Sequence, residues 1–556
     1  MINEAAGGVT GLSPLVGVRQ DDLVDALKST TVQALKQPLL AAKHSAGFAS
    51  KMVDVLAGKS SYQVGRKDRR FNDDTWQENG LYKRLLQVYL ALDESFDEWV
   101  TDLDLGASEE RKARFVVDLL TDGVAPTNYL LTNPAALKKA RATRGGSLVQ
   151  GIRHALDDIR HNNKMPSQVD KSQFKVGDNL ATTEGAVVFR NEVLELIQYQ
   201  PKTARVQKIP MLVVPPQINK FYVFDLTPEK SMFKFIVEQG LQLFTVSWRN
   251  PTSEQRHWGL DEYLNALTEA VEAVQAITGQ PKLNLMGACS GGITASILAG
   301  YLNAVGNDAI NALTLMVCVL SQDRDDSDIT VFANPRSIEN ARRSSQKKGI
   351  LDGAELSRVF NWMRPNDLIW NYVVNNYLMG NKPPAFDILY WNNDTTNLPA
   401  QLHSDFLDQI LTNPLATPGD LTVLDQPIDL SALDYDKYML GGVTDHITPW
   451  HACYRSTQIM GGDIRFILSN SGHIQAMVNP PGNPKANYFS NDALPASHEE
   501  WLEGAQQHAG TWWDDWAGWL QQRSGKKVIA RKTLGKRGAF EAMEAAPGTY
   551  VFGVSQ

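Results

Sequence analysis

The fold is decided by ten residues at positions 283–292, Leu283-Asn284-Leu285-Met286-Gly287-Ala288-Cys289-Ser290-Gly291-Gly292. An apolar strand leads into the pattern Gly-x-Cys-x-Gly and then into a segment that we expect to be helical. A strand–turn–helix bend of this kind presents its central residue, here Cys289, as a nucleophile. Small neighbours are needed because larger side chains would collide across the turn. The helix that follows directs its positive end at the thiolate, which lowers the pKa of the thiol from about 8.5.

Two other interpretations compete with a nucleophilic Cys289. A lone cysteine is commonly a small buried hydrophobe, and this is the better reading of Cys318, which lies in an apolar strand, and of Cys453. The same stretch also contains Ala-x-Ser-x-Gly, which would make Ser290 the nucleophile of a serine hydrolase. Cys289 is the simpler choice because a glycine stands two residues away on each side.

Strands and helices alternate around this stretch, as they do in a parallel sheet. The predicted fold class is therefore α/β, and the cysteine bend makes it an α/β-hydrolase fold. The expected strands are 186–199 (with a turn at Arg190-Asn191), 211–214, 243–246, 283–286, 313–320, 438–440 and 465–468, and the expected helices between them are 229–239, 261–277 and 291–303.

Two domains are expected in the chain. Residues 1–175 read as a mostly helical N-terminal domain, with amphipathic helices over 21–57 and 81–104. Residues 176–556 form the predicted catalytic domain, interrupted by a polar, proline-punctuated insertion at about 321–430. Insertions in such sheets usually lie over the carboxyl ends of the strands, where ligands bind. We interpret this one as a cap or lid, with a separate packing domain as the alternative.

An acid and a histidine follow the nucleophile in the order expected of this fold. Asp445 comes just after one strand, and His473 comes just after the next, in a loop that contains glycine. Near neutral pH, His473 can take the proton of Cys289, and a positioned base contributes about 10²–10⁴-fold to the rate. Asp445 holds the imidazole or activates another proton. The rival histidines are His446, which more readily orients the loop beside the acid, and His451.

Two backbone N–H groups are expected to hold the oxyanion of the reaction. One belongs to Ser290, and the other belongs to the loop after strand 211–214, where Ile218 is our choice. A thiol exchanges acyl groups with another thiol at nearly equal energy, so a thioester is a natural substrate. A lid that excludes water favours transfer over hydrolysis. The residues therefore predict a thiol acyltransferase or a thiol hydrolase, without naming its substrate.

Composition excludes several other classes of protein. Hydrophobic residues make up 43% and charged residues 21% of the 556 residues, as in ordinary globular proteins. A net charge of −8 argues against nucleic-acid binding, which needs a basic footprint. Three cysteines do not make a disulfide framework. The sequence shows no secretory signal, no apolar run near the ~18 residues of a membrane span, no metal cluster and no nucleotide-binding glycine loop, so we expect a cytoplasmic protein without metal or cofactor.

Tryptophans crowd the C-terminal part of the chain. Trp512, Trp516 and Trp519 fall on one face of an expected helix, and Trp501 and Trp513 lie nearby. The simpler interpretation is a helix docked on the core. The alternative is a patch against a lipid-like surface, because tryptophan favours such boundaries.

Further motifs extend over nearly the whole chain after about residue 65. They are Asp68-Arg69-Arg70-Phe71, Ala125-Pro126-Thr127-Asn128, Phe189-Arg190-Asn191-Glu192, Pro215-Pro216-Gln217-Ile218-Asn219-Lys220-Phe221-Tyr222, Val246-Ser247-Trp248-Arg249-Asn250-Pro251 and Trp391-Asn392-Asn393-Asp394. With them the sequence resembles the polyhydroxyalkanoate synthase family. The alanine and serine beside Cys289 and the chain length resemble the class II synthases, which prefer medium-chain monomers.

The resemblance implies polymerisation of (R)-3-hydroxyacyl-CoA into polyester with release of CoA, which is part of the substrate and not a cofactor. By analogy Cys289 carries the growing chain as a thioester, His473 deprotonates it, and Asp445 activates the 3-hydroxyl group, directly or through His473. Gln475 is implied as a residue of the acyl pocket. The family works as a homodimer on cytoplasmic polyester granules, and the N-terminal region and the tryptophan-rich part are candidate contacts with the granule or its associated proteins.

Two rival functions remain open from the sequence. An esterase or depolymerase of the same fold, with a thiol or serine nucleophile, would pass the acyl group to water. A non-enzymatic granule-associated protein would bind polyester and release no CoA. The acceptor of the acyl group therefore distinguishes the three functions: a polymerase passes it to a hydroxyl group, a hydrolase passes it to water, and a granule-associated protein transfers no acyl group.

Overall fold

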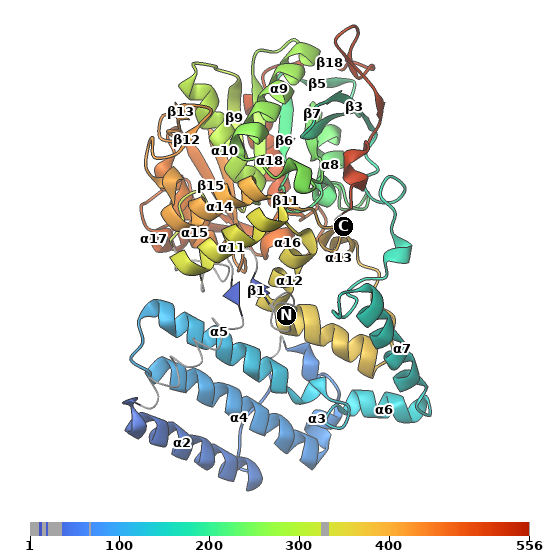
Figure 1. The fold of residues 1–556 in the computed structure, drawn as a ribbon, viewed down its shortest axis with the longest axis vertical. Helices are drawn as coiled ribbons and strands as arrows, with labels where there is room; N and C mark the ends of the chain where they lie inside the picture. The colour runs from blue at the N-terminus through green and yellow to red at the C-terminus, as the bar shows by residue number, and fades with distance from the viewer. Residues whose placement is uncertain (1–10, 14–17, 20–35, 66–67, 324–332, 555–556) are drawn as a thin grey trace. The chain divides into compact units, whose positions relative to one another are not determined.

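The computed structural model describes residues 11–13, 18–19, 36–65, 68–323 and 333–554. These residues form two compact units, drawn in Figure 1. The helical unit contains the described residues up to Lys171 together with Arg358–Phe386, and the sheet unit contains those of Ser172–Ser357 and Asp387–Gln556. The predicted insertion at 321–430 is thus divided between the two units. None of the helices in the described ranges is both long and apolar enough to cross a lipid bilayer.

The helical unit is built on helices that lie side by side (Figure 1). Asn79 caps the longest of them through its side chain, which accepts hydrogen bonds from the N–H groups of Leu81 and Tyr82 in the first turn. Phe71, Trp76, Leu86 and Tyr89 form its small apolar core. The elements are β1 (Gly11–Ser13), β2 (Val18–Arg19), α2 (Pro38–Leu56), α3 (Thr75–Glu78), α4 (Gly80–Asp102), α5 (Ala107–Val124), α6 (Pro134–Ala142), α7 (Gly146–His161) and the π-helical segments η6 (Asn366–Trp370) and η7 (Val373–Leu378).

Residues 358–386 join the helical unit because η7 packs closely on α7. Gly151 has no side chain that would collide with the carbonyl group of Tyr377. The Tyr377 hydroxyl group donates to Asp158 over 2.8 Å, and the Asn376 amide donates to the carbonyl of Ser167 over 2.7 Å. The predicted N-terminal helix at 21–57 is present as α2 from Pro38 on, and its residues 21–35 lie outside the described ranges.

The sheet unit contains an eleven-stranded sheet in the order β17-β16-β15-β14-β9-β8-β6-β7-β4-β3-β21 among the described residues. The six strands from β15 to β7 are parallel, and the outer strands at both edges are antiparallel. The strands are β3 (Gly185–Arg190), β4 (Leu194–Tyr199), β6 (Met211–Val214), β7 (Leu243–Trp248), β8 (Leu283–Ala288), β9 (Ile310–Met316), β14 (Lys437–Gly442), β15 (Ile464–Ser469), β16 (Asn487–Ser490), β17 (Gln506–Ala509) and β21 (Glu544–Ala545).

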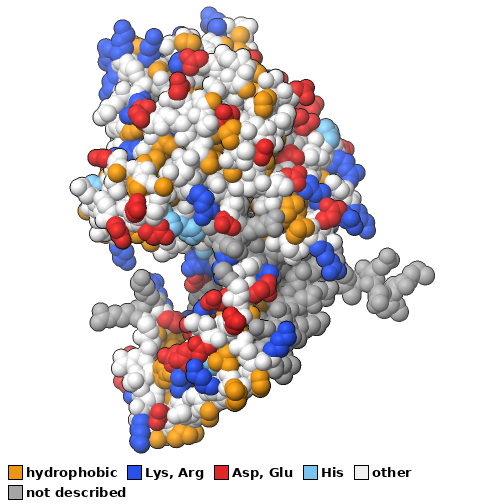
Figure 2. Space-filling model, turned by 90° about the vertical axis from the view of Figure 1, so that its left-hand side faces the viewer, with side chains coloured by type: hydrophobic (Ala, Val, Ile, Leu, Met, Phe, Trp, Pro, Cys, Tyr) orange, Lys and Arg blue, Asp and Glu red, His pale blue; other side chains and the backbone are white. Residues whose placement is uncertain are grey.

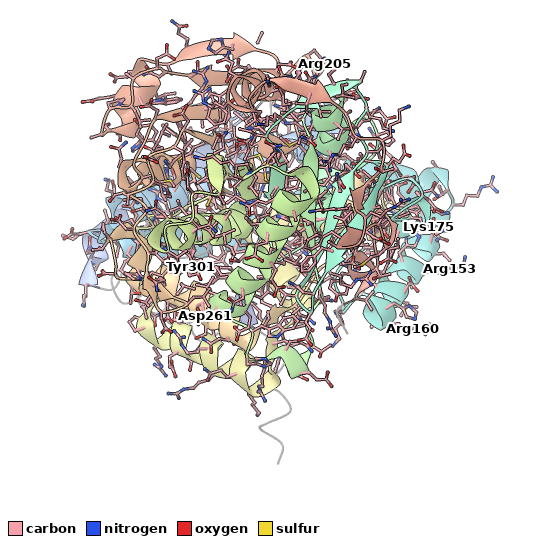
Figure 3. The ribbon with its side chains drawn as sticks, turned by 90° about the horizontal axis from the view of Figure 1, so that it is seen from above. Arg153, Arg160, Lys175, Arg205, Asp261 and Tyr301 are labelled. Atoms are coloured by element: carbon pink, nitrogen blue, oxygen red, sulfur yellow. The ribbon has the colours of Figure 1, made fainter. Side chains whose placement is uncertain are left out.

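Helices cover both faces of this sheet, which is why its central strands are buried along their whole length (Figures 1 and 3). One face carries α9 and α10, and the other carries α8 and α18, whose Phe235 and Trp513 rings are 5.3 Å apart. The helices are α8 (Met232–Glu238), α9 (Leu260–Thr278), α10 (Cys289–Ala304), α11 (Pro335–Lys348), α12 (Gly353–Met363, which crosses into the helical unit), α13 (Asp387–Asn392), α14 (Ala400–Thr412), α15 (Trp450–Arg455), α16 (His473–Met477), α17 (His498–Glu503) and α18 (Trp512–Arg523).

Short elements complete the sheet unit. The 3₁₀ turns η4 (Phe221–Phe224) and η10 (Tyr550–Phe552) lie near the functional site considered below. The remaining short strands are β5 (Arg205–Gln207), β10 (Ile350–Leu351), β11 (Leu398–Pro399), β12 (Thr422–Val423), β13 (Gln426–Pro427), β18 (Lys527–Ile529), β19 (Gly535–Lys536) and β20 (Phe540–Glu541).

Two sequence expectations need correction. The helix after the cysteine bend begins at Cys289 itself, not at residue 291, and β9 ends at Met316, not at residue 320. Trp512, Trp513, Trp516 and Trp519 are all buried, which confirms the simpler interpretation of α18 as a helix docked on the core.

Candidate active site

Cys289 occupies a strained bend between β8 and α10. Its φ angle is +49°, in the left-handed region that residues other than glycine rarely adopt. A side chain at Gly287 would collide with Gly292 and Ala295 across the turn, and one at Gly291 would collide with the backbone of the loop after β6. The bend can therefore form only with glycines at these two positions, as the sequence pattern predicts.

The environment of the Cys289 sulfur suits a nucleophile better than the environments of the other two thiols do. Cys289 is half-buried, whereas Cys318 and Cys453 are buried. It is the first residue of α10, whose N-terminal N–H groups and dipole favour a thiolate. Burial raises the pKa of the Cys318 and Cys453 thiols well above the ordinary value. These two cysteines are core residues, as predicted.

The structure brings His473 and Asp445 together with Cys289. The Nδ1 atom of His473 lies 2.7 Å from Oδ2 of Asp445, and the imidazole is also in hydrogen-bonding contact with Cys289. With Nδ1–H donated to the carboxylate, Nε2 is the nitrogen that can exchange a proton with sulfur. The three side chains follow β8, β14 and β15, parallel strands whose carboxyl ends share one edge of the sheet.

Thr448 completes this arrangement and was not predicted from the sequence. Its hydroxyl group donates to Oδ2 of Asp445 over 2.8 Å and lies 3.0 Å from Nδ1 of His473. The N–H groups of Ile447 and Thr448 donate to Oδ1 of Asp445 over 2.9 and 3.0 Å. The carboxylate is thereby fixed in one orientation. Asp445 and Thr448 are separated by three residues, and this Asp-x-x-Thr spacing is the signal that could have identified Thr448.

Charges inside the site shift two pKa values. Burial acts to lower the pKa of His473, but the negative charges of Asp445 and of the Cys289 sulfur act in the opposite direction and are stronger, so this pKa is raised to about 10. Burial acts to raise the pKa of Asp445, but His473 and the hydrogen bonds from Thr448 more than offset it, so this pKa is lowered. The site therefore stabilises the protonated imidazole that forms when His473 accepts a proton.

Helix α18 holds His473 in place through α16. The indole N–H groups of Trp512 and Trp513 donate to the carbonyl groups of Ala476 and Met477 over 2.7 and 2.9 Å. Ala476 and Met477 are the last two residues of a five-residue helix that begins at His473. Their carbonyl groups have no N–H donor within the helix, so the indoles supply one. The buried tryptophans thus have a role in the site that the sequence did not reveal.

The loop after β6 lies against the cysteine bend. The Oγ atom of Ser290 accepts a hydrogen bond from the N–H of Gln217 over 3.2 Å, and Ser290 is buried. Pro215 and Pro216 have no N–H group, so Ile218 is the first residue of the loop with an uncommitted N–H among the described residues. These contacts are consistent with the N–H groups of Ile218 and Ser290 as the donors to the oxyanion. The Ser290 hydroxyl group is occupied by its hydrogen bond with the N–H of Gln217.

The other predicted site residues lie at the margin. His446 is half-buried beside Asp445, and Gln475 is exposed on α16. The His451 ring lies 5.6 Å from that of His498. A role of these three residues in the pocket stays a prediction.

Comparison with known proteins identifies the family of the chain. Residues 67–236 match the family described as "Poly-beta-hydroxybutyrate polymerase (PhaC) N-terminus", and residues 210–480 match the "alpha/beta hydrolase fold". "Poly(3-hydroxyalkanoate) polymerase 1" of Ectopseudomonas oleovorans is 50% identical over 99% of this chain and 98% of its own length. "Poly(3-hydroxyalkanoate) polymerase 2" of the same organism is 47% identical over 97% of this chain and 96% of its own length. The chain belongs to the poly(3-hydroxyalkanoate) polymerase family.

Membership of this polymerase family confirms the resemblance seen in the sequence, the α/β-hydrolase fold and the predicted acyltransferase class. The "Poly(3-hydroxyalkanoate) polymerase subunit PhaC" of Cupriavidus necator is 38% identical over 98% of this chain and 91% of its own length. Among solved structures, a hydrolase from Pseudomonas aeruginosa PA01 aligns with a TM-score of 0.31 and 11% identity, covering 53% of this chain and 94% of that chain.

Proposed function

We propose that this polymerase joins (R)-3-hydroxyacyl groups, taken from their CoA thioesters, into polyhydroxyalkanoate by covalent catalysis at Cys289. The observation that carries the proposal is the left-handed bend at Cys289, which presents its sulfur to His473 and Asp445. Transfer of the acyl group from the thiol of CoA to the enzyme is nearly balanced in energy when the nucleophile is also a thiol, and Cys289 provides one.

The first half-reaction loads the enzyme. His473 takes the proton of the Cys289 thiol, and the thiolate attacks the thioester carbonyl. The oxyanion forms beside the N–H groups of Ser290 and Ile218. When the tetrahedral intermediate collapses, the carbon–sulfur bond to CoA breaks, and His473 returns the proton to the departing CoA thiolate. Asp445 keeps the imidazole oriented and stabilises its charged form.

The second half-reaction lengthens the chain. The 3-hydroxyl group of an incoming monomer gives its proton to His473 and attacks the acyl-Cys289 thioester, which frees the Cys289 thiol. The product is a CoA thioester that is one unit longer, and Cys289 attacks it in turn with release of CoA. Asp445 acts on the hydroxyl group through His473, because its carboxylate contacts the Nδ1 atom of that ring.

The proposal includes the setting implied by the family resemblance. The monomers are medium-chain acids, as in the class II enzymes. The enzyme works as a homodimer at the surface of cytoplasmic polyester granules, in contact with the growing polymer and with granule-associated proteins. The helical unit supports a granule contact because hydrophobic side chains are exposed on it, whereas the buried tryptophans of α18 do not.

Trapping of the acyl-enzyme tests the proposal. With (R)-3-hydroxyoctanoyl-CoA we expect mass spectrometry to find the acyl group on Cys289, with release of CoA thiol, an insoluble product and little free hydroxy acid. Cys289→Ala should abolish both labelling and CoA release, which also excludes a purely granule-coating protein. Ser290→Ala should keep measurable activity.

Two outcomes would contradict this function. Free hydroxy acid in amounts equal to the CoA released would identify a hydrolase. Label on Ser290, together with activity in Cys289→Ala, would assign the nucleophile to Ser290.

A further inference from the structure

The loop that carries Ile218 is fixed from one side by residues 391–396. The N–H and hydroxyl groups of Thr396 donate to the carbonyls of Ile218 and Gln217 over 3.2 and 2.6 Å. The indole N–H of Trp391 donates to the carbonyl of Lys220 over 2.7 Å. The position of the Ile218 N–H group therefore depends on Thr396 and Trp391, which hold the carbonyl groups of the same loop.

Lys220 connects the same loop to the C-terminal segment. Its side chain is 3% exposed. Its ammonium group donates to the carbonyls of Val551 and Gly553 over 2.6 and 2.5 Å and lies 3.2 Å from Asp394. Burial lowers the pKa of Lys220, and Asp394 opposes that effect. Every proton of this ammonium group thus has an acceptor, and the three acceptors come from two segments distant in sequence.

The C-terminal segment is itself anchored by a buried acid. The carboxylate of Glu195 in β4 is fully buried and accepts hydrogen bonds from the N–H groups of Thr549 and Tyr550 over 3.0 Å each. The hydroxyl group of Thr549 donates to it over 2.7 Å, and Arg190 pairs with it over 2.5 Å. Residues 549–553 therefore form a clip between two buried charges, Glu195 and Lys220.

Burial of the Lys220 ammonium group is unfavourable unless its partners compensate for the loss of water. Removal of a lysine ammonium group from water costs several kcal/mol. Its hydrogen-bond partners offset this cost only when their distances and angles are good. Loss of the ammonium group would leave the Val551 carbonyl without its Lys220 donor. It would leave Asp394 with the Tyr222 hydroxyl group and the Gly553 carbonyl with the Asn250 amide. The loop two residues from Ile218 would then shift toward new partners.

We propose that Lys220 is a positioning residue that ties the C-terminal clip to the oxyanion loop and thereby sets the place of the Ile218 N–H group. This inference rests on the proposed function, because it concerns the oxyanion of the acyl-transfer step. It predicts that Lys220 affects reactions at Cys289 only when they pass through an oxyanion.

Two reactions of the same sulfur test the inference. Acylation by (R)-3-hydroxyoctanoyl-CoA needs the oxyanion donors, whereas alkylation by iodoacetamide does not. In Lys220→Met we expect the acylation rate to fall about 10- to 100-fold, because loss of one complete oxyanion donor costs about 10²–10³-fold. The alkylation rate of Cys289, followed by mass spectrometry, should stay within about twofold of that of the unmodified enzyme.

Lys437→Met is the matched control. Lys437 is also a buried lysine, and its ammonium group donates to the carbonyls of Leu433, Tyr435 and Gly461 over 2.7–2.9 Å. It lies at the start of β14, at the opposite end of the strand from Asp445. Its loss should lower stability, as the loss of Lys220 does, and leave the acylation rate of the folded enzyme within about twofold.

A double-mutant cycle with Glu195→Gln tests the clip itself. Both carboxylate oxygens of Glu195 accept hydrogen bonds. In Glu195→Gln the NH₂ group of the glutamine side chain must therefore face one of these donors, which breaks a hydrogen bond and loosens residues 549–553. If the two residues act through the same clip, Lys220→Met should add little to the loss of acylation already caused by Glu195→Gln.

The outcomes are distinct. Equal loss of acylation and alkylation in Lys220→Met, an equal loss of acylation in Lys437→Met, or additive losses in the cycle would each overturn the positioning role. If the unmodified enzyme acylates Cys289 and Lys220→Met does so equally fast, the inference fails and the proposed function stands. If the unmodified enzyme does not acylate Cys289, both fail.

Discussion

At the scale of single residues, the site depends on an imidazole held between the Asp445 carboxylate and the Cys289 sulfur. Asp445 and the Cys289 sulfur flank His473, and Thr448 contacts both the acid and the ring. The pairing is strong because the groups are buried, where charges are poorly screened. Since His473 keeps its proton more tightly in the folded chain than in the unfolded one, the site contributes to stability as well as to chemistry.

The stability contribution of His473 should therefore depend on pH. Its pKa is raised to about 10 in the folded protein, against about 6.5 in an unfolded chain. The stabilisation is complete below pH 6.5 and is lost as the pH rises toward 10. We expect His473→Gln to lower the free energy of unfolding by about 1 kcal/mol or more at pH 6, beyond its effect at pH 10, as measured by urea denaturation at each pH.

His161→Gln serves as the control for this measurement. His161 pairs with Asp157 on the surface, where both side chains are 71% exposed. Such pairs contribute little to stability, so the variant should change the urea midpoint little at either pH. A loss in His473→Gln that is equal at both pH values, or larger at pH 10, would contradict the assigned pairing.

Sequence reasoning identified these residues by where they stand along the chain. Cys289 follows β8 directly, and Asp445 and His473 come three and four residues after β14 and β15. Parallel strands bring such positions to one edge of the sheet. Thr448 and Lys220 do not stand at strand ends. The Asp-x-x-Thr spacing could have indicated Thr448. The role of Lys220 depends on which carbonyl and carboxylate groups lie opposite it in space, and no spacing rule gives that information.

At the scale of elements, α18 is coupled to the site through α16. A helix of five residues is not stable alone, and α16 depends on the indole donors of Trp512 and Trp513 at its end. His473, at the start of α16, is thus positioned from both sides: by Asp445 through its ring and by α18 through its backbone.

Removal of one indole donor should therefore lower activity as well as stability. Trp512→Phe keeps a ring in the core but leaves the carbonyl of Ala476 without its donor, which costs about 1–3 kcal/mol. Displacement of His473 should lower kcat by up to about tenfold in CoA-release assays, with KM nearly unchanged.

Trp516→Phe is the matched control, because the indole N–H of Trp516 donates to the Thr314 hydroxyl group in β9 and not to α16. Trp516→Phe should destabilise the enzyme as much as Trp512→Phe does, as measured by thermal unfolding. It should lower kcat less than Trp512→Phe does. Equal losses of kcat in the two variants would show that α18 supports only the fold.

Most of the elements themselves could be predicted. Apolar runs such as Leu283–Ala288 can only be strands covered on both faces, and the helices between them followed from their period. A core position was the simpler prediction for α18, and the burial of its tryptophans confirms it, although tryptophan also suits an interface. The division of residues 321–430 could not be foreseen, since the packing of η7 on α7 uses glycines and backbone carbonyls and not an apolar pattern.

At the scale of the whole molecule, exposed apolar side chains are unevenly distributed. Thirteen of the twenty large hydrophobic side chains that are exposed among the described residues belong to the helical unit, although it is the smaller of the two. Figure 2 shows such side chains at the surface of this unit. Exposed apolar side chains that gather on one part of a protein suggest a binding surface. The proposed contact with the polyester granule would be such a surface.

Helix α7 carries the most regular part of this surface. Val149, Ile152, Leu156 and Ile159 are spaced by three or four residues and are all exposed, so they form one apolar stripe along the helix. Arg153 and Arg160, labelled in Figure 3, lie on the outer side of α7. An apolar stripe beside basic side chains is typical of a helix that lies on a lipid-like interface.

The stripe on α7 should be needed for binding to polyester but not for chemistry on soluble substrate. Burial of an isoleucine or leucine side chain contributes about 1.5–3 kcal/mol, so the double variant Ile152→Ser with Leu156→Ser should bind polyester particles at least about tenfold more weakly in co-sedimentation. Val305→Ser, an exposed apolar residue of the sheet unit, is the control and should bind normally. Because the Cys289 site lies wholly within the sheet unit, the initial rate of CoA release from (R)-3-hydroxyoctanoyl-CoA should be the same in all three proteins. Unchanged sedimentation of the double variant would place the granule contact elsewhere.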